Sequence, residues 1–248
     1  MRNRSCQTLA LAIFPLLSSL PVPGHAEPLG AVRTPLAAGR LDSVVGMPLY
    51  FRLYRARLPP AGHAAYEGVN ALLYELSGAA SLEIQGGATQ PVANGDGAFI
   101  AAGQIVTIRA STAAPADLLL FLLTARPNQR RPLLDRPAVI RELFRTPDPL
   151  PGLQEGPYEF SLARLTLPAE TPADPDYSRS GAALDYVLAG TAALTADGKT
   201  ETISAEMPFF ERFGWVHSLA NSGAVPLVLV EANISQEGVA AGHSAADK

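Results

Sequence analysis

The sequence predicts an all-β fold made of two copies of one plan, and two observations support this prediction. Short runs of apolar and Thr residues alternate with turn residues, most clearly where the Asp-Gly pair at 197–198 separates two such runs. Asp-Gly between strand-like runs is typical of a two-residue β-hairpin, whose turn needs φ > 0 at both central positions. In addition, residues 71–78 (ALLYELSG) align without a gap with residues 183–190 (ALDYVLAG).

The internal repeat continues beyond these segments. Residues 97–106 align with residues 208–217, and each half ends in an apolar run, at 118–123 and at 225–230. Matches in the same order and at similar spacing are the signature of a duplicated structural unit. The repeat therefore predicts two domains rather than one large one.

Two motifs in the second copy resemble those of a known family. Residues 186–190 (YVLAG), the hairpin, and then residues 214–221 (GWVHSLAN) resemble the two conserved motifs of the cupins, which are small antiparallel β-barrels of the jelly-roll type. In metal-binding cupins the first motif supplies two His and one Glu, and the second motif supplies a third His. The resemblance implies two tandem jelly-roll barrels, a two-domain cupin or bicupin.

The resemblance also implies that the metal site is degenerate. His217 and Asn221 match the second cupin motif, but the first motif does not match. Its Glu position falls on Ala183, and its two His positions fall on Tyr177 and Arg179. Only one of four ligands, His217, is present, so no cofactor is predicted and a divalent metal is kept as an alternative.

Composition shifts divide the chain into six segments. They are a signal peptide (1–26), an N-terminal arm with little periodicity (27–49), the first barrel (50–124), a linker (125–157), the second barrel (158–234) and a flexible tail (235–248). Within the linker, residues 137–145 are predicted to form a short helix, because Pro137 suits a first helical turn and apolar residues mark one side. Val106 stands where the second copy has His217, so the first barrel is expected to be structural.

The first 26 residues are typical of a secretory signal. Arg2 and Arg4 precede an apolar run at 9–20, and small residues lead to an expected cleavage after Ala26. The run is shorter than the ~20 residues of a membrane span, so we expect export to the periplasm or the exterior without membrane insertion. The single cysteine, Cys6, lies in this segment, so no disulfide is expected in the exported chain.

The net charge of the chain indicates which classes of binding partner to expect. The chain has 19 basic residues, and removal of Arg2 and Arg4 with the signal would leave 17 against 23 acidic ones, a net charge of −6. An acidic surface gives no electrostatic footprint for nucleic acid, so none is expected as a partner. A small-molecule ligand is the predicted partner, and the cupin resemblance adds a homodimer as a family expectation.

Strand alternation predicts which side chains face the interior of the second barrel. If the Ala183 position faces inward, Asp185 does so too, whereas Leu184 and Tyr186 face outward. The predicted interior residues are Tyr177, Arg179, Asp185, Trp215 and His217. Either Phe209 or Phe213 is expected near the rim.

The first functional hypothesis is a metal-free pocket for a small anionic or sugar-like molecule. Arg179 would bind a carboxylate or enolate oxygen, Asp185 would orient His217, and aromatic side chains (Tyr177, Trp215 and Phe213) would form flat walls. If a reaction occurs, His217 is the expected proton-transfer group.

Two alternatives remain open. One is a metal-dependent enzyme of the dioxygenase, isomerase or decarboxylase type, in which His217 acts with Asp185, Asp176 or Tyr177 as an unusual ligand set. The other is a structural or interaction barrel, in which Asp185 and Arg179 neutralise each other and His217 bonds to a strand carbonyl.

Overall fold

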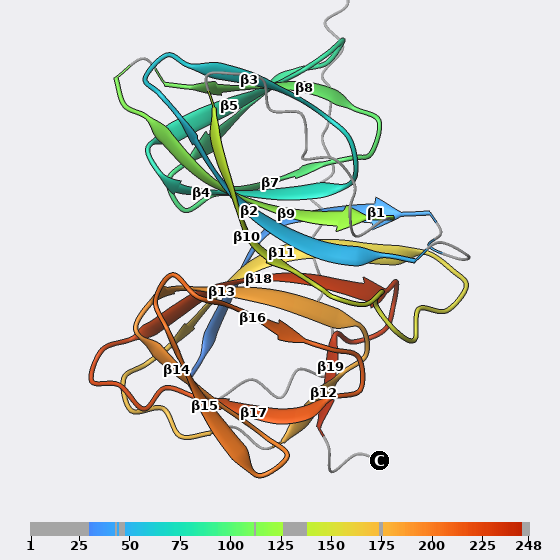
Figure 1. Ribbon diagram of the computed structural model, residues 1–248, viewed down its shortest axis with the longest axis vertical. Helices are drawn as coiled ribbons and strands as arrows, with labels where there is room; N and C mark the ends of the chain where they lie inside the picture. The colour runs from blue at the N-terminus through green and yellow to red at the C-terminus, as the bar shows by residue number, and fades with distance from the viewer. Residues whose placement is uncertain are drawn as a thin grey trace, which may run out of the picture.

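The computed structural model describes residues 30–42, 44, 48–111, 113–125, 138–173 and 176–244, and within these ranges it contains strands and no helix (Figure 1). No helix in the described part of the chain is therefore long and apolar enough to cross a membrane. The predicted signal peptide, with Cys6, lies outside the described residues.

Nineteen strands follow one another in the described part of the chain. They are β1 (Val32–Leu41), β2 (Tyr50–Leu58), β3 (His63–Glu67), β4 (Ala71–Ser77), β5 (Ala79–Ile84), β6 (Thr89–Ala93), β7 (Gly97–Ile100), β8 (Ile105–Ala110), β9 (Ala116–Thr124), β10 (Val139–Arg145), β11 (Tyr158–Leu167), β12 (Tyr177–Arg179), β13 (Ala182–Ala189), β14 (Thr191–Ala196), β15 (Lys199–Ser204), β16 (Pro208–Glu211), β17 (Val216–Ala220), β18 (Leu227–Gln236) and β19 (Gly242–Ser244).

The strands form four sheets that are stacked as four layers (Figure 1). The first barrel has an outer sheet, β3-β8-β5-β6, and an inner sheet, β10-β2-β9-β4-β7. The second barrel has an inner sheet, β1-β11-β18-β13-β16, and an outer sheet, β15-β14-β17-β12-β19. Neighbouring strands run antiparallel, which confirms the predicted all-β class.

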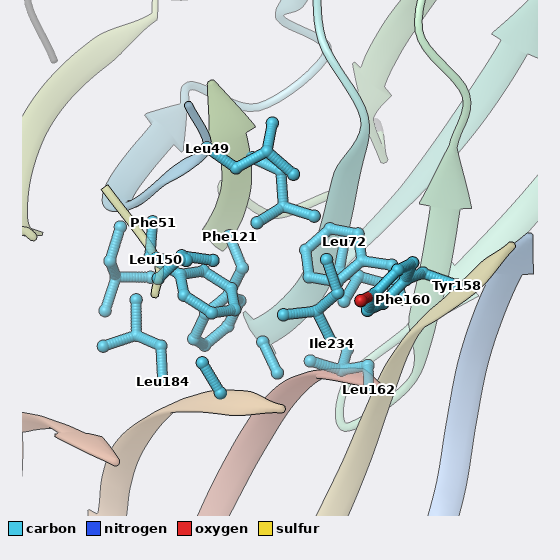
Figure 2. Close-up of a cluster of buried hydrophobic side chains, with 14 of the residues drawn as sticks. Leu49, Phe51, Leu72, Phe121, Leu150, Tyr158, Phe160, Leu162, Leu184 and Ile234 are labelled. Atoms are coloured by element: carbon cyan, nitrogen blue, oxygen red, sulfur yellow. The ribbon is translucent and has the colours of Figure 1, made fainter. Parts of the chain in front are cut away.

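Three apolar clusters hold these layers together. One fills the first barrel, around residues such as Leu73 and Leu120, and another fills part of the second barrel, around Val187 and Leu229. The third lies between the two inner sheets, where aromatic and aliphatic side chains from both barrels meet (Figure 2). The labelled members of this third cluster are Leu49, Phe51, Leu72, Phe121, Leu150, Tyr158, Phe160, Leu162, Leu184 and Ile234.

Strand alternation explains the layering. Leu184 and Tyr186 point out of the second barrel, as predicted, but they are buried because the first barrel covers that face. Each inner sheet is thus buried on both faces, one toward its own barrel and the other toward its neighbour, as in sheets covered on both sides.

The helix predicted at 137–145 is wrong, because Val139–Arg145 is the strand β10. It pairs antiparallel with β2 and forms an edge of the first inner sheet. The apolar residues that suggested a helical face are instead divided between the two sides of an extended segment: Ile140 packs on the first-barrel core, whereas Leu143 and Phe144 pack on the cluster between the barrels. Pairing with a sheet edge has overridden the local preference.

Two further segments are more ordered than the sequence indicated. The N-terminal arm contains β1, which pairs with β11 along most of its length and has a register shift at Pro35, a residue that an edge strand tolerates. The predicted flexible tail contains β19, which pairs with β12 through Tyr177, Ser178 and Arg179. In both cases an open sheet edge, which the local sequence does not reveal, supplies the hydrogen-bonding partners.

Candidate functional site

The second barrel buries a group of ionisable side chains that we call the charged cluster. Its five members are each at most 4% exposed. They are Arg179, Asp185, Glu211, His217 and Glu231, one from each of β12, β13, β16, β17 and β18.

Strand register brings the cluster together. Asp185 lies opposite Glu231 across β13 and β18, and its neighbour Ala183 lies opposite Glu211 across β13 and β16. On the outer sheet, Tyr177 of β12 lies opposite His217 of β17. The two sheets therefore direct these side chains into one interior, because alternate residues of a barrel strand face inward.

The cluster is joined by ion pairs of alternating charge. Arg179 donates from Nε to Glu211 Oε2 and from Nη2 to Glu231 Oε2. Arg33, which reaches in from β1, donates from its two Nη atoms to Glu231 Oε1 and Oε2 at 2.9 and 3.1 Å. The Tyr177 hydroxyl donates to Glu211 Oε1 at 3.1 Å. Both glutamates are thus paired, as buried charges must be.

His217 lies between two acceptors. Its Nδ1 is 2.9 Å from the Trp215 carbonyl oxygen, and its Nε2 is 3.1 Å from Glu211 Oε1. The second contact is a charge-pair distance without hydrogen-bond alignment, since Nε2 has no hydrogen-bond partner. The ring is stacked on Trp215, with centroids 4.8 Å apart, and lies 4.3 Å from the Tyr177 ring. Only the doubly protonated imidazole carries a proton toward both oxygens.

The three carboxyl groups differ in their protonation. Burial raises the pKa of Asp185 well above its usual value, and the neighbouring Glu211 and Glu231 charges raise it further. Burial also opposes ionisation of the two glutamates, but Arg179 outweighs it and lowers the pKa of both, with help from His217 at Glu211 and from Arg33 at Glu231. Asp185 is therefore the neutral acid of the cluster, and its Oδ2 is buried without a hydrogen bond.

A metal at the positions that the cupin motifs assign does not fit these residues. Ala183 offers no ligand atom, and the Tyr177 hydroxyl is engaged with Glu211. Arg179 is itself a cation held by two carboxylates. Since sites for divalent transition metals need at least three protein ligands, His217 alone cannot complete one there.

A cleft of about 330 Å³ lies beside the cluster. It is lined by Leu194, Ala196, Lys199, Thr200, Glu201 and Trp215. The predicted hairpin positions most of these residues: β14 and β15 pair around Asp197 and Gly198, whose φ values of 51° and 71° confirm the expected turn. Trp215 lines the cleft and also stacks on His217, so it separates the cleft from the charged cluster.

The structure brings five of the six predicted site residues together. The exception is Phe213, which is 44% exposed and lies against Gly152, where an added Cβ would come within 2.8 Å of its ring. The expected pairings also differ: Glu211, rather than Asp185, is the carboxylate beside His217. Among the described residues, no ion pair joins Arg179 to Asp185.

The sequence pattern does not predict two members of the charged cluster, Glu211 and Glu231, or Arg33, which contacts it from β1. Glu231 did leave a signal, because it is a charged residue inside the apolar strand Leu227–Gln236. Glu211 follows two Phe residues, and Arg33 lies in the arm that was expected to lack periodicity. Charges in such surroundings indicate a buried partner or a site.

Comparisons with known proteins agree with this architecture. No family model and no curated protein matches the chain in sequence. Among solved structures, oxalate decarboxylase of Bacillus subtilis matches with a TM-score of 0.58 and 15% identity over 88% of this chain and 78% of that chain.

Two other solved structures are similar. The Lactobacillus farciminis oxalate decarboxylase formate complex matches with a TM-score of 0.58 and 12% identity over 84% of this chain and 88% of the other. AerE of Microcystis aeruginosa matches with a TM-score of 0.53 and 14% identity over 81% and 97%. The chain is therefore a cupin-fold protein.

Proposed function

We propose that this cupin-fold protein binds a small organic molecule in the cleft of its second barrel, without a standard cupin metal site. The observation that supports this most is the cleft itself, a concave site of about 330 Å³ with one aromatic wall and a few polar groups. Small-molecule sites are typically concave, with apolar walls and a small number of convergent polar groups.

The lining favours a ligand that combines an anionic group with hydroxyls or a flat apolar part. Lys199 is the cation of the cleft and forms no ion pair with a described residue, whereas Glu201 and Thr200 offer hydrogen-bonding oxygens. Leu194 and Trp215 supply the apolar surface. Arg179 does not meet the ligand in this proposal, because both of its carboxylate partners are buried with it.

His217 is set behind Trp215 rather than in the cleft lining. In this proposal His217 positions Trp215 by stacking and by its contact with the Trp215 carbonyl oxygen. A direct proton-transfer role would require the ligand to pass Trp215. The protein is thus proposed as a binding protein first, and as an enzyme only if turnover depends on His217.

The test is a binding screen with two variants. Small carboxylates, sugar acids and neutral sugars are titrated into the wild-type protein, Lys199→Ala and Trp215→Ala by calorimetry. We expect an anionic compound to bind the wild type and to lose about tenfold in affinity in Lys199→Ala, because a charge-assisted hydrogen bond contributes ~1.5 kcal/mol or more. Arg109→Ala, which removes an exposed charge from the first barrel, is the matched control.

Two results would contradict the proposal. One is that no compound of the three classes binds the wild-type protein at millimolar concentration. The other is that a compound binds, but equally well to Lys199→Ala, Trp215→Ala and the control.

We also propose that the chain is exported, because its first 26 residues are typical of a secretory signal. Expression from the full sequence, cell fractionation and N-terminal sequencing of the product test this. Cleavage after Ala26 is the expected result, and a cytoplasmic product that retains Met1 would contradict it.

A further inference from the structure

We infer that the charged cluster is a divalent-cation site that the Arg179 guanidinium closes. Ligand oxygens of Asp185, Glu211 and Glu231 lie within 4.8 Å of one another, and all three residues are almost fully buried. The two ionised carboxylates among them, Glu211 and Glu231, require a cation in a protein interior, and in this chain a side chain supplies it.

The guanidinium lies where a bound ion would have to be. Arg179 donates to Glu211 and Glu231 from two different nitrogens, so the cationic group lies between those two carboxylates. Arg33 contacts Glu231 from the sheet edge and is partly exposed. Removing Arg179 would therefore open the middle of the cluster, whereas removing Arg33 would not.

A second, independent feature points to the same place. His217 is 1% exposed, its Nε2 has no hydrogen bond, and this nitrogen is 3.1 Å from Glu211 Oε1. This imidazole nitrogen lies next to Glu211, at the edge of the three acidic groups, and offers a further ligand atom there. Oxygen-rich sets of this kind suit Mg²⁺, Ca²⁺ and Mn²⁺, and the imidazole favours Mn²⁺ among them.

This site differs from the one that the cupin motifs assign. Of the four motif positions only His217 takes part, and the carboxylates come from β13, β16 and β18. The Arg179 guanidinium thus provides the positive charge that an ion from solution would otherwise provide, whatever ligand the cleft binds.

The experiment measures Mn²⁺ binding in four proteins. They are the wild type, Arg179→Ala, Arg179→His and the control Arg33→Ala, each prepared in chelator, dialysed, and then titrated with Mn²⁺ by calorimetry and by electron paramagnetic resonance. We expect one Mn²⁺ per chain in Arg179→Ala and in Arg179→His, and none in the wild type or in Arg33→Ala. Bound Mn²⁺ should raise the melting temperature of the two Arg179 variants alone, since a ligand stabilises the state that binds it.

A double variant identifies the ligands. Adding Glu211→Gln to Arg179→His should weaken Mn²⁺ binding at least tenfold, because a carboxylate ligand is replaced by a neutral amide. A loss of less than threefold would show that the ion binds elsewhere.

Other results would overturn the inference. Stoichiometric Mn²⁺ in the wild type would mean that Arg179 does not close the site, and equal binding by Arg33→Ala would mean that the ion lies at the edge. Folded Arg179 variants that bind no Mn²⁺ would contradict it directly. Failure of both variants to fold even in Mn²⁺ would do so as well, because the ion is inferred to substitute for the guanidinium.

Discussion

The two barrels share one strand plan but differ in what they bury. Across β13 and β18 of the second barrel, Asp185 faces Glu231, whereas across β4 and β9 of the first barrel Leu73 faces Leu120 at the corresponding place. Aliphatic residues thus complete the same interior without any charge. The comparison teaches that this fold does not require the charged cluster, since buried ion pairs can often be replaced by apolar residues at no loss of stability.

The same contrast holds at two other positions. Ala183 lies opposite Glu211 in the second barrel, and Ala71 lies opposite Ile100 in the first. His217 lies opposite Tyr177, and Val106 lies opposite Tyr66. Four of the five charged positions, Asp185, Glu211, His217 and Glu231, thus have an apolar counterpart, which makes the first barrel an internal control for experiments on the second.

The largest effect is expected for Arg179→Ala in metal-free buffer. Glu211 would keep only His217 and Tyr177, and Glu231 only Arg33, so two buried carboxylates would lose their shared cation. Removing one partner of a buried ion pair typically costs 3–5 kcal/mol, and we expect a loss of about this size in the free energy of unfolding, measured by urea denaturation. Arg40→Ala, which breaks exposed ion pairs that solvent screens, should leave the free energy of unfolding nearly unchanged. A loss below ~1 kcal/mol in Arg179→Ala would mean that the cluster is not held by this cation.

A smaller effect is expected in the pH dependence of stability, which differs between the acids of the two barrels. The first barrel buries one acid without an arginine partner, Glu75, and burial raises its pKa from 4.5 to about 8. The folded protein therefore holds a proton that the unfolded chain releases above pH ~4.5. The stability from this group is fully present below that pH and is lost as the pH rises to about 8, by a few kcal/mol at ~1.4 kcal/mol per pKa unit.

Glu75→Gln is the test of this pH dependence. The neutral amide cannot ionise, so the variant should lose less stability than the wild type between pH 5 and 8, as measured by urea denaturation at several pH values. Glu211 and Glu231, whose pKa values are lowered, act in the opposite direction and lose stability only as the pH falls below their usual range. Parallel pH profiles for the wild type and Glu75→Gln would refute the prediction.

The smallest effect compares two tyrosines at corresponding positions. The Tyr177 hydroxyl donates to the Glu211 carboxylate, whereas the Tyr66 hydroxyl donates to the neutral Val69 carbonyl at 2.7 Å. Hydrogen bonds to charged groups contribute ~1.5–3 kcal/mol and neutral ones ~0.5–1.5 kcal/mol. Thermal or urea unfolding should therefore show a larger loss for Tyr177→Phe than for Tyr66→Phe. A larger loss for Tyr66→Phe than for Tyr177→Phe would mean that the charge on Glu211 does not strengthen its hydrogen bond with Tyr177.

Local sequence was enough to predict the strands of the second barrel and much of its interior. Alternation placed Asp185 and His217 inside, and the Asp-Gly pair fixed the hairpin beside the cleft, because both signals depend only on near neighbours. Glu211 and Glu231 were missed because their role depends on the register between strands far apart in sequence. Arg33 was missed because its strand, β1, pairs with β11, and the whole first barrel lies between these two strands in the sequence.

Two parts of the chain show where predictions from local sequence patterns fail. The segment of β10 has apolar residues at a spacing that suits a helix, and only the free edge of β2 makes it a strand. The Tyr pair shows the effect of loop length: Tyr177 lies six residues before Ala183, but Tyr66 lies five before Ala71. When the two repeats are aligned without a gap across such a loop, every residue before the loop is matched with the wrong residue of the other repeat.

The pairing of β1 with the second barrel has a consequence for how the chain is made. β1 precedes the first barrel but completes the inner sheet of the second, whereas β10 follows the first barrel and completes its inner sheet. On a ribosome, β1 must wait for β11, about 120 residues later, which is on the order of 6–24 s at ~5–20 residues per second. During that interval a ten-residue strand lacks its native hydrogen-bonding partner. The second barrel is not contiguous in the sequence, because β1 precedes the first barrel and β11 to β19 follow it, so a cut in the linker separates β1 from the rest of its sheet.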